Sequence, residues 1–216
     1  MSGRIFAVGD VHGRLDKLAT LLGRLPLLPD DRLVFLGDYL NRGTEAGQVL
    51  DRLLALRAER PDTVFLRGNH EQAVLRYGRT QDPEELRLLR DIGFQATLDS
   101  YGCSSFCGLD FMPVEHEEFL EGLLPWWEEG PWVFFHAPLA HGVNPEAATP
   151  DELENLLSGR KIDGPGWAAS GRTLIFGHIP LETPLVAPGL IGIDTGAGHG
   201  HLLTAVELPA LRFFHA

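Results

Sequence analysis

Residues 5–22 read IFAVGDVHGRLDKLATLL, and this stretch decides the fold class. Its first four residues are an apolar run rich in branched and aromatic side chains, which is typical of a buried strand. One apolar helix face then follows at Leu15, Leu18, Ala19 and Leu22. Between the two lies the polar turn Gly9-Asp10-Val11-His12-Gly13. The stretch therefore predicts a strand and a helix, with polar side chains at the point where the strand ends.

The same alternation continues along the chain. A second apolar helix stripe runs from Ala46 to Leu56, and further strand-like runs occupy residues 33–36, 63–66, 132–135, 174–176, 190–193, 202–206 and 211–214. Residues 72–130 predict mostly helix, with one helix starting at Asp82-Pro83 and another at Pro113. The strands after residue 173 predict a second sheet near the C-terminus. Together these patterns indicate an α/β fold.

Length and composition narrow the class of protein. The chain has 216 residues, enough to bury its own core, and we expect residues 1–216 to form one domain. Its 44% hydrophobic and 22% charged residues are typical of a folded protein, and two cysteines are too few for a disulfide framework. No apolar run reaches 18 residues, and the first residues lead into a strand-like run instead of a signal peptide. We therefore expect a cytoplasmic protein.

The charge balance restricts the partners. The 18 Lys and Arg residues against 30 Asp and Glu residues give a formal net charge of −12. Such a charge repels nucleic-acid backbones and anionic membranes, so we expect neither as a partner. An anionic substrate would need a strong local positive site.

Polar side chains able to bind a metal follow five of the predicted strands. The five segments are Gly9-Asp10-Val11-His12-Gly13, Gly37-Asp38-Tyr39-Leu40-Asn41-Arg42-Gly43, Arg67-Gly68-Asn69-His70-Glu71, Phe135-His136-Ala137 and Gly177-His178. Ligand sites of α/β sheets form at such strand ends. Asp, Asn and His without thiolates suit Mn, Fe or Zn, and glycine turns allow close convergence. The pattern predicts a site for two metal ions.

Each segment alone has an ordinary explanation. A single Gly-Asp after a strand is usually a turn or a helix cap, and a lone His in an apolar run is usually a satisfied interior residue. Five such segments at strand ends in one chain make coincidence a poor explanation.

These segments resemble the motifs of the calcineurin-like metallophosphoesterases, and within them the phosphoprotein phosphatase family, from Gly9 to the Ile193-Asp194-Thr195-Gly196-Ala197 turn. The length is most similar to that of the small bacterial and phage protein phosphatases. The resemblance implies two β-sheets packed as a sandwich and flanked by helices. It also implies a metal-dependent phosphatase with two divalent ions, expected to be Mn, with Fe or Zn as alternatives.

The resemblance assigns roles residue by residue. Asp10 and His12 would bind the first metal, Asp38 would bridge both ions, and Asn69, His136 and His178 would complete the second metal. His70 would donate a proton to the leaving group, and Arg42 would bind the phosphate. A second phosphate-binding arginine is harder to place, and we assign it to Arg160. The nucleophile is then a metal-activated water instead of a side chain.

One motif residue departs from the family. Asn41 stands where the family usually has an Asp that hydrogen-bonds the catalytic histidine. We expect the Asn41 carbonyl oxygen to accept the imidazole N–H, without a negative charge to stabilise the imidazolium. The pKa of His70 should then be low, which weakens protonation of poor leaving groups such as a serine alkoxide. Aryl phosphates and phosphoanhydrides would suffer less.

Three functions compete at this point. The first is a serine/threonine, and also tyrosine, protein phosphatase acting as a monomer. The second is symmetrical hydrolysis of dinucleoside polyphosphates such as diadenosine tetraphosphate, a related branch that typically has Gln in place of His12. The third is a phosphate-binding or sensing protein with little catalysis, which only Asn41 supports. Specificity should lie in residues 72–130 and 137–172, where motif residues are fewest.

Overall fold

The computed structural model describes residues 3–104 and 106–216. Its first half alternates strands and helices: β1 (Ile5–Val8), α1 (Leu15–Arg24), β2 (Arg32–Phe35), α2 (Ala46–Glu59), β3 (Val64–Phe65) and α3 (Asn69–Thr80). Three short helices follow: α4 (Pro83–Asp91), α5 (Phe94–Ser100) and α6 (Val114–Glu121). The second half contains β4 (Trp126–Glu129), β5 (Trp132–Phe135), η1 (Pro145–Ala147), α7 (Pro150–Leu157), α8 (Gly164–Ser170), β6 (Thr173–Phe176), β7 (Leu185–Ala187), β8 (Leu190–Gly192), η2 (Ala197–His199), β9 (Thr204–Leu208) and β10 (Arg212–His215).

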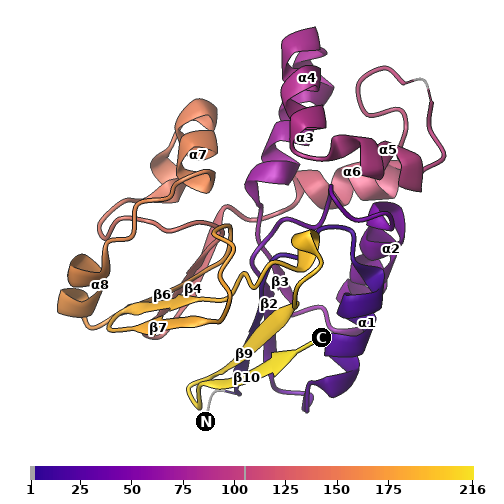
Figure 1. Ribbon diagram of the computed structural model, residues 1–216. Coiled ribbons are helices and arrows are strands. Elements are labelled where there is room, and N and C mark those ends of the chain that lie inside the picture. Colours follow the sequence, from indigo (N-terminus) through magenta and orange to yellow (C-terminus); the bar gives the residue numbers. More distant parts are fainter. Residues whose placement is uncertain (1–2, 105) are drawn as a thin grey trace.

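The strands form two five-stranded mixed sheets. The first has the order β10-β9-β1-β2-β3, with β1, β2 and β3 parallel and β9 antiparallel to β1. The second has the order β4-β5-β6-β8-β7, with β5, β6 and β8 parallel. Helices α1 and α2 lie beside the first sheet, and α7 and α8 lie beside the second (Figure 1). The predicted sandwich with flanking helices is therefore confirmed.

The alternation of side chains along the strands explains these layers. In β1, Ile5 and Ala7 belong to the buried cluster between the sheets, together with Phe134 and Ile175 of the second sheet. The intervening Phe6 packs with the helices on the opposite face. A strand residue points to alternate faces, so a continuously apolar strand is buried on both sides. Full burial of one such side chain contributes ~1.5–3 kcal/mol.

The structure corrects three details of the sequence interpretation. Residues 72–130 contain the strand β4, which the helical prediction for that segment missed. A further short strand, β7, was not predicted. The strands β9 and β10 do not belong to a C-terminal sheet, because β9 pairs with β1 in the first sheet and the second sheet is built on β5 and β6. A strand pattern shows that a strand exists, but its partner depends on contacts distant in sequence.

The first turn of α4 agrees with the sequence expectation. The Asp82 side chain accepts a hydrogen bond from the backbone N–H of Glu84, and Pro83 occupies the first helical turn. Among the residues that the structure describes, no helix is long and apolar enough to cross a membrane.

Candidate metal centre

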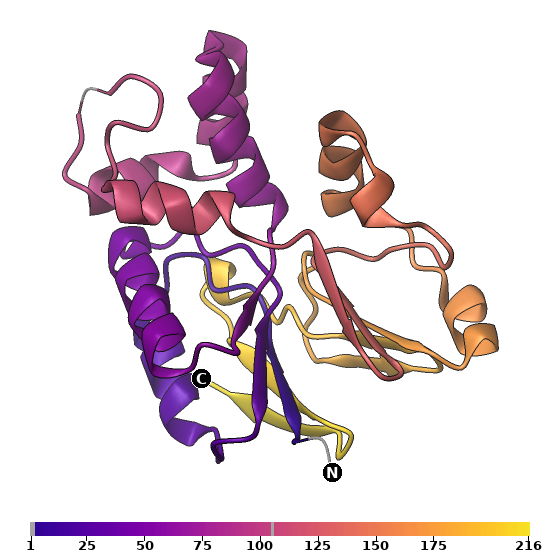
Figure 2. The ribbon, with the colours of Figure 1, turned by 180° about the vertical axis from the view of Figure 1, so that it is seen from behind.

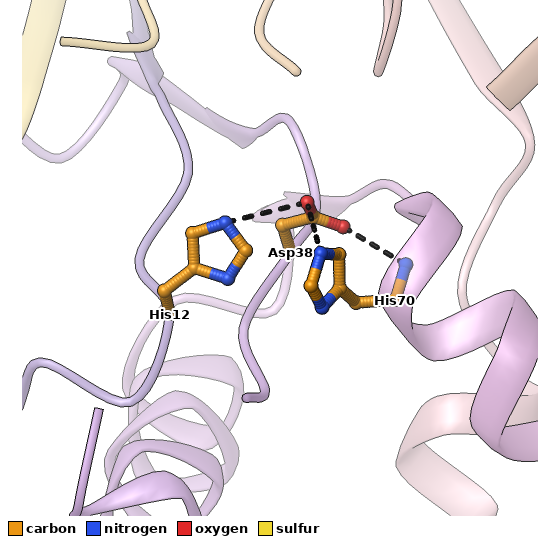
Figure 3. A group of neighbouring side chains, drawn as sticks. All are labelled: His12, Asp38 and His70. Atoms are coloured by element: carbon orange, nitrogen blue, oxygen red, sulfur yellow. Dashed lines mark hydrogen bonds and ion pairs between the residues drawn. The ribbon is translucent and has the colours of Figure 1, made fainter. Parts of the chain in front are cut away.

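The polar segments that follow β1, β2, β3, β5 and β6 meet where the two sheets adjoin. Two groups of side chains each offer ligand atoms within 4.8 Å of one another: His12, Asp38 and His70 in one, and Asp38, His136 and His178 in the other. Asp38 belongs to both groups, which matches its predicted bridging role. Figure 3 shows His12, from the loop after β1, and His70, from the first turn of α3, both directed at the Asp38 carboxylate.

The first group is almost entirely withdrawn from solvent. The Nε2 atoms of His12 and His70 lie 3.5 and 3.7 Å from Asp38 Oδ2. The backbone carbonyl of Leu40 lies 2.9 Å from His12 Nδ1, so Nδ1 carries the proton of the neutral ring. That hydrogen bond leaves a lone pair on His12 Nε2, which a metal ligand requires.

In the second group, hydrogen-bond acceptor atoms again lie close to one another. The Leu36 carbonyl oxygen accepts from His136 Nδ1 at 2.9 Å, which leaves His136 Nε2 with a lone pair. That atom lies 2.9 Å from Asn69 Oδ1 and 3.5 Å from Asp38 Oδ1. Asn69 Oδ1 also lies 2.9 Å from His178 Nδ1, while His178 Nε2 is buried without a hydrogen-bond partner. Acceptors that face one another need a cation between them, so these residues fit a metal ion.

Burial shifts the pKa values of the cluster in a consistent direction. Loss of hydration raises the pKa of Asp38 to about 7, and it raises the pKa of Asp10 well above its usual value, with Asp194 and Asp38 adding repulsion. Burial also lowers the pKa of His12 to about 3 and that of His136 to about 4. The imidazoles are therefore neutral at pH 7, and the crowded carboxylates lack a compensating charge. A divalent cation would supply that charge.

Backbone geometry brings the ligands together. The Glu71 carboxylate, which is fully buried, accepts hydrogen bonds from the backbone N–H groups of Asp38, Tyr39, Leu40 and Gly68 at 2.8–3.2 Å. It thereby fastens the loop after β2 to the start of α3. Several non-glycine residues in these loops have positive φ, a conformation that costs energy and persists only when neighbouring contacts fix it: His12, Asp38, Asn41, Arg42 and His178.

Two glycines provide the room that the carboxylates occupy. A Cβ atom on Gly68 would lie 2.1 Å from Asp38 Oδ1, and one on Gly177 would lie 2.1 Å from Asp10 Oδ1. Asp10 lies outside the two close groups above, but its carboxylate accepts from the backbone N–H of His178 at 3.1 Å. Asp10 thus lies beside the candidate ligand His178, which follows β6 of the second sheet.

The environment of His70 differs from the expectation in one respect. Asn41 Nδ2, not its carbonyl oxygen, faces His70 Nδ1 at 2.8 Å. The reason is Thr97: its hydroxyl accepts from the Asn41 backbone N–H at 2.9 Å and donates to Asn41 Oδ1 at 2.8 Å, which turns the amide nitrogen toward the ring. The proton of neutral His70 is then on Nε2, 3.7 Å from Asp38 Oδ2. The pKa of His70 is lowered, first by burial.

The two predicted phosphate-binding arginines occupy different positions. Arg42 Nη1 lies 2.9 Å from His12 Nε2 and 3.1 Å from His199 Nε2, and Nη2 lies 3.5 Å from His70 Nε2. Arg42 therefore points into the cluster. Arg160 is exposed after α7. Burial, followed by repulsion from His136 and from the Arg160 charge, lowers the pKa of His178 to about 3.

Sequence reasoning missed two contributors. Thr97 lies in α5, 56 residues from Asn41, in no motif, and nothing in the sequence pointed to it. Asp194 follows β8, is 2% exposed and raises the pKa of Asp10 by repulsion. The resemblance extends to the Ile193-Asp194-Thr195-Gly196-Ala197 turn, but the sequence analysis assigned no role to Asp194.

The model of the calcineurin-like phosphoesterase family matches residues 3–182. The chain belongs to this family. A curated relative from Geobacillus thermodenitrificans, the asymmetrical bis(5'-nucleosyl)-tetraphosphatase PrpE, is 25% identical, with 94% of this chain and 90% of the relative covered. The Drosophila melanogaster serine/threonine-protein phosphatase rdgC is 40% identical, but over only 39% of this chain and 13% of its own length. A cold-active protein-tyrosine phosphatase from a Shewanella species shares the fold, with 18% identity and a TM-score of 0.66 over 100% of this chain and 78% of that one.

Membership of the calcineurin-like phosphoesterases makes this chain a metal-dependent phosphatase. The predicted fold, the predicted enzyme class and the predicted use of divalent metals agree with this finding. The relative that matches nearly the full chain is named for a dinucleoside tetraphosphate, whereas rdgC, which matches locally, is named for phosphorylated serine and threonine. Membership of the family alone therefore does not identify the substrate.

Proposed function

We propose that the chain is a two-metal hydrolase acting on phosphoanhydrides of the dinucleoside polyphosphate class. The proposed ligands are Asp10, His12, Asp38, Asn69, His136 and His178, and their oxygen and imidazole donors favour manganese. Bound divalent ions would acidify a water molecule and neutralise phosphate oxygens. Because these ligands come from both sheets, we also propose that residues 1–216 work as one catalytic domain, as a monomer in the cytoplasm.

The chain's own side chains support the positioning of phosphate. Arg42 presents two guanidinium nitrogens to the interior of the cluster, where it can bind a phosphate oxygen pair. His70 presents Nε2–H on the same side and can donate a hydrogen bond to a leaving oxygen. Arg160 is proposed as the second phosphate contact.

The observation that carries the substrate proposal is the pairing of Asn41 with His70. The amide nitrogen of Asn41 donates to His70 Nδ1, so this contact favours the neutral ring over the imidazolium. A neutral imidazole is a weak acid and assists poorly when an alkoxide departs. A nucleotide leaves from an anhydride as a stabilised phosphate anion and needs less protonation. The asymmetrical tetraphosphatase relative, which matches over nearly the whole chain, supports the same choice.

A protein phosphatase is the second candidate, and a specific observation favours it. The chain has His12 in the first motif, where the symmetrical dinucleoside polyphosphate hydrolases typically have Gln. His12 lies with Asp38 in the first group of candidate ligands, where the resemblance to phosphoprotein phosphatases expects it. The partial similarity to rdgC supports this alternative.

The test compares substrates under metal control. Purified protein stripped of metal is assayed with and without added Mn²⁺ on diadenosine tetraphosphate, a phosphoserine peptide and p-nitrophenyl phosphate. We expect Mn²⁺-dependent hydrolysis, with the highest kcat/KM on the dinucleotide. A higher kcat/KM on the phosphopeptide would select the second candidate. Binding of Mn²⁺ without turnover of any of the three would favour the sensing protein.

A further inference from the structure

A cavity of about 300 Å³ opens directly beside the candidate metal centre. It lies between α3, α4 and α7, which face one another in both ribbon views (Figures 1 and 2). Asn69, whose Oδ1 lies 2.9 Å from both His136 and His178, forms part of the cavity wall. A substrate held at the metal centre therefore has direct access to this cavity.

The floor of the cavity is apolar. It is lined by Ala73 of α3, by Leu88 and Leu89 of α4, and by Ile92, which follows α4. Leu88 is 56% exposed, so a large apolar side chain of the cavity lining is accessible from solvent. Apolar walls with a few polar groups are typical of small-molecule pockets, whose volumes start at about 300 Å³. The size suits one nucleoside and is too small for a whole dinucleotide.

The rim of the cavity is acidic. Arg76 Nε bonds Glu85 at 2.6 Å, and Arg76 Nη1 bonds Glu154 at 2.8 Å, so this arginine joins α3 to both α4 and α7. With Asp91, three carboxylates and one guanidinium line the rim. The guanidinium is paired with Glu85 and Glu154, and Asp91 lies 3.7 Å from Arg87, which does not line the cavity. A phosphate chain would meet a rim of net negative charge. Hydroxyl and amino donors of a neutral group would meet acceptors, as a ribose does on a carboxylate in other nucleotide sites.

We propose that this cavity, the α3–α4–α7 pocket, binds one nucleoside of the substrate, with the base on the leucine floor and the ribose toward the carboxylate rim. The inference rests on the proposed hydrolysis of dinucleoside polyphosphates and names the recognition element for it. The two walls come from residues 72–130 and 137–172. The phosphates remain on the side of Arg42, and the nucleoside occupies the acidic side.

The experiment compares two anhydrides of the same chemistry, diadenosine tetraphosphate and inorganic tripolyphosphate. The variant is Leu88→Asn, which keeps the side-chain size, adds no charge and changes an exposed residue. We expect the ratio of kcat/KM for the dinucleotide to that for tripolyphosphate to fall about tenfold, since an apolar contact with the base is lost. The matched control is Leu28→Asn, because Leu28 is 59% exposed and does not line the cavity. Its ratio should equal that of the wild type.

Two outcomes overturn the pocket proposal. One is an unchanged ratio in Leu88→Asn. The other is a larger loss of kcat/KM in this variant on a phosphoserine peptide flanked by arginines than on the dinucleotide, which would assign the acidic rim to a basic peptide.

A separate measurement keeps the pocket testable if neither anhydride is hydrolysed. Binding of adenosine alone is then followed by saturation-transfer NMR. A signal with the wild type and the Leu28→Asn variant that is lost in Leu88→Asn supports the pocket, although the proposed substrate fails. Absence of a signal with the wild type overturns the pocket itself.

Discussion

The candidate metal centre has two halves that are held in place differently. The half on the first sheet contains the loops after β1, β2 and β3, and the buried Glu71 carboxylate joins four of their backbone N–H groups. The half on the second sheet contains His136 and His178. Its contacts reach across to the first half: His136 donates to Leu36, and the His178 backbone N–H donates to Asp10.

The two halves differ in whether the protein itself or a bound cation fixes the candidate ligands. In the first half, a protein carboxylate already satisfies the loop amides, so the loops are fixed before any metal binds. In the second half, His178 Nε2 is buried without a hydrogen-bond partner. The positions of the second-half side chains should therefore depend more on a bound metal ion.

We expect the largest loss of stability and activity when the hydrogen bonds of the Glu71 carboxylate in the first half are removed. Glu71→Gln replaces a carboxylate that accepts four N–H bonds by an amide with one acceptor oxygen, leaving buried donors opposed by an NH₂ group. We expect a loss of about 3 kcal/mol in the free energy of unfolding, measured by urea denaturation, and a fall in kcat on the order of 100-fold. The control is Glu115→Gln on the exposed face of α6. A stability loss as small as that of the control would contradict the role of Glu71.

The next prediction concerns the folding stability of the metal-free protein, which should depend on pH. Burial raises the folded-state pKa of Asp38 to about 7, and burial with repulsion from Asp194 and Asp38 raises that of Asp10 well above its usual value. Both exceed the unfolded values near 4, so the unfolded chain releases these protons first. Stability is then full below about pH 4 with respect to these groups and declines as pH rises toward 8.

Thermal unfolding of metal-free protein between pH 7 and 8.5 measures this decline, because above pH 7 the buried histidines are largely neutral in both the folded and the unfolded chain. Added Mn²⁺ should reverse it, and by more at pH 8.5 than at pH 7, because metal binds the ionised carboxylates. A Tm of the metal-free protein that rises over this range would refute the expectation.

A smaller effect, on turnover, is expected from the residue that contacts His70. Asn41→Asp puts a negative charge beside His70 Nδ1 and stabilises the imidazolium. We expect turnover of a phosphoserine peptide to rise about tenfold and that of p-nitrophenyl phosphate to change little, because only the serine alkoxide needs a strong acid. Rates on both substrates are measured across pH. Equal changes on the two would show that leaving-group protonation is not the step affected.

The smallest expected effect concerns the edge of the second half. Arg160→Ala removes an exposed guanidinium, and we expect KM for phosphate substrates to rise about threefold with kcat nearly unchanged. Arg172→Ala is the control, since Arg172 pairs with Glu128 on β4. If both variants behave alike, Arg160 does not contact substrate.

The sequence predicted the site better than it predicted the sheets. Strand ends followed by Asp, Asn and His predicted where Asp38, His136 and His178 would meet, because parallel strands bring their carboxyl ends to one edge. The strand β4, Trp126–Glu129, escaped detection because its side chains are half-buried or exposed instead of alternating. The short strand β7 is likewise incompletely buried. Such edge strands lack the periodicity on which the prediction depends.

Other features depend on contacts that no local pattern contains. The orientation of the Asn41 amide is set by Thr97, which reaches it only through the packing of α5. The pairing of β9 with β1 joins segments about 200 residues apart, and a single sequence shows no sign of it. The α3–α4–α7 pocket arises where the two segments with the fewest motif residues meet. Its walls were expected in those segments, but its shape was not.

The close approach of Gly68 and Gly177 to two carboxylates has a consequence for evolvability. In a library of random substitutions, any side chain at either position would displace Asp38 or Asp10, so survivors should retain glycine there as strictly as they retain the ligands. Variation that survives selection must then accumulate in the helices around the centre. New substrates would be acquired by remodelling α4 and α7, while the hydrolytic apparatus passes unchanged from ancestor to descendant.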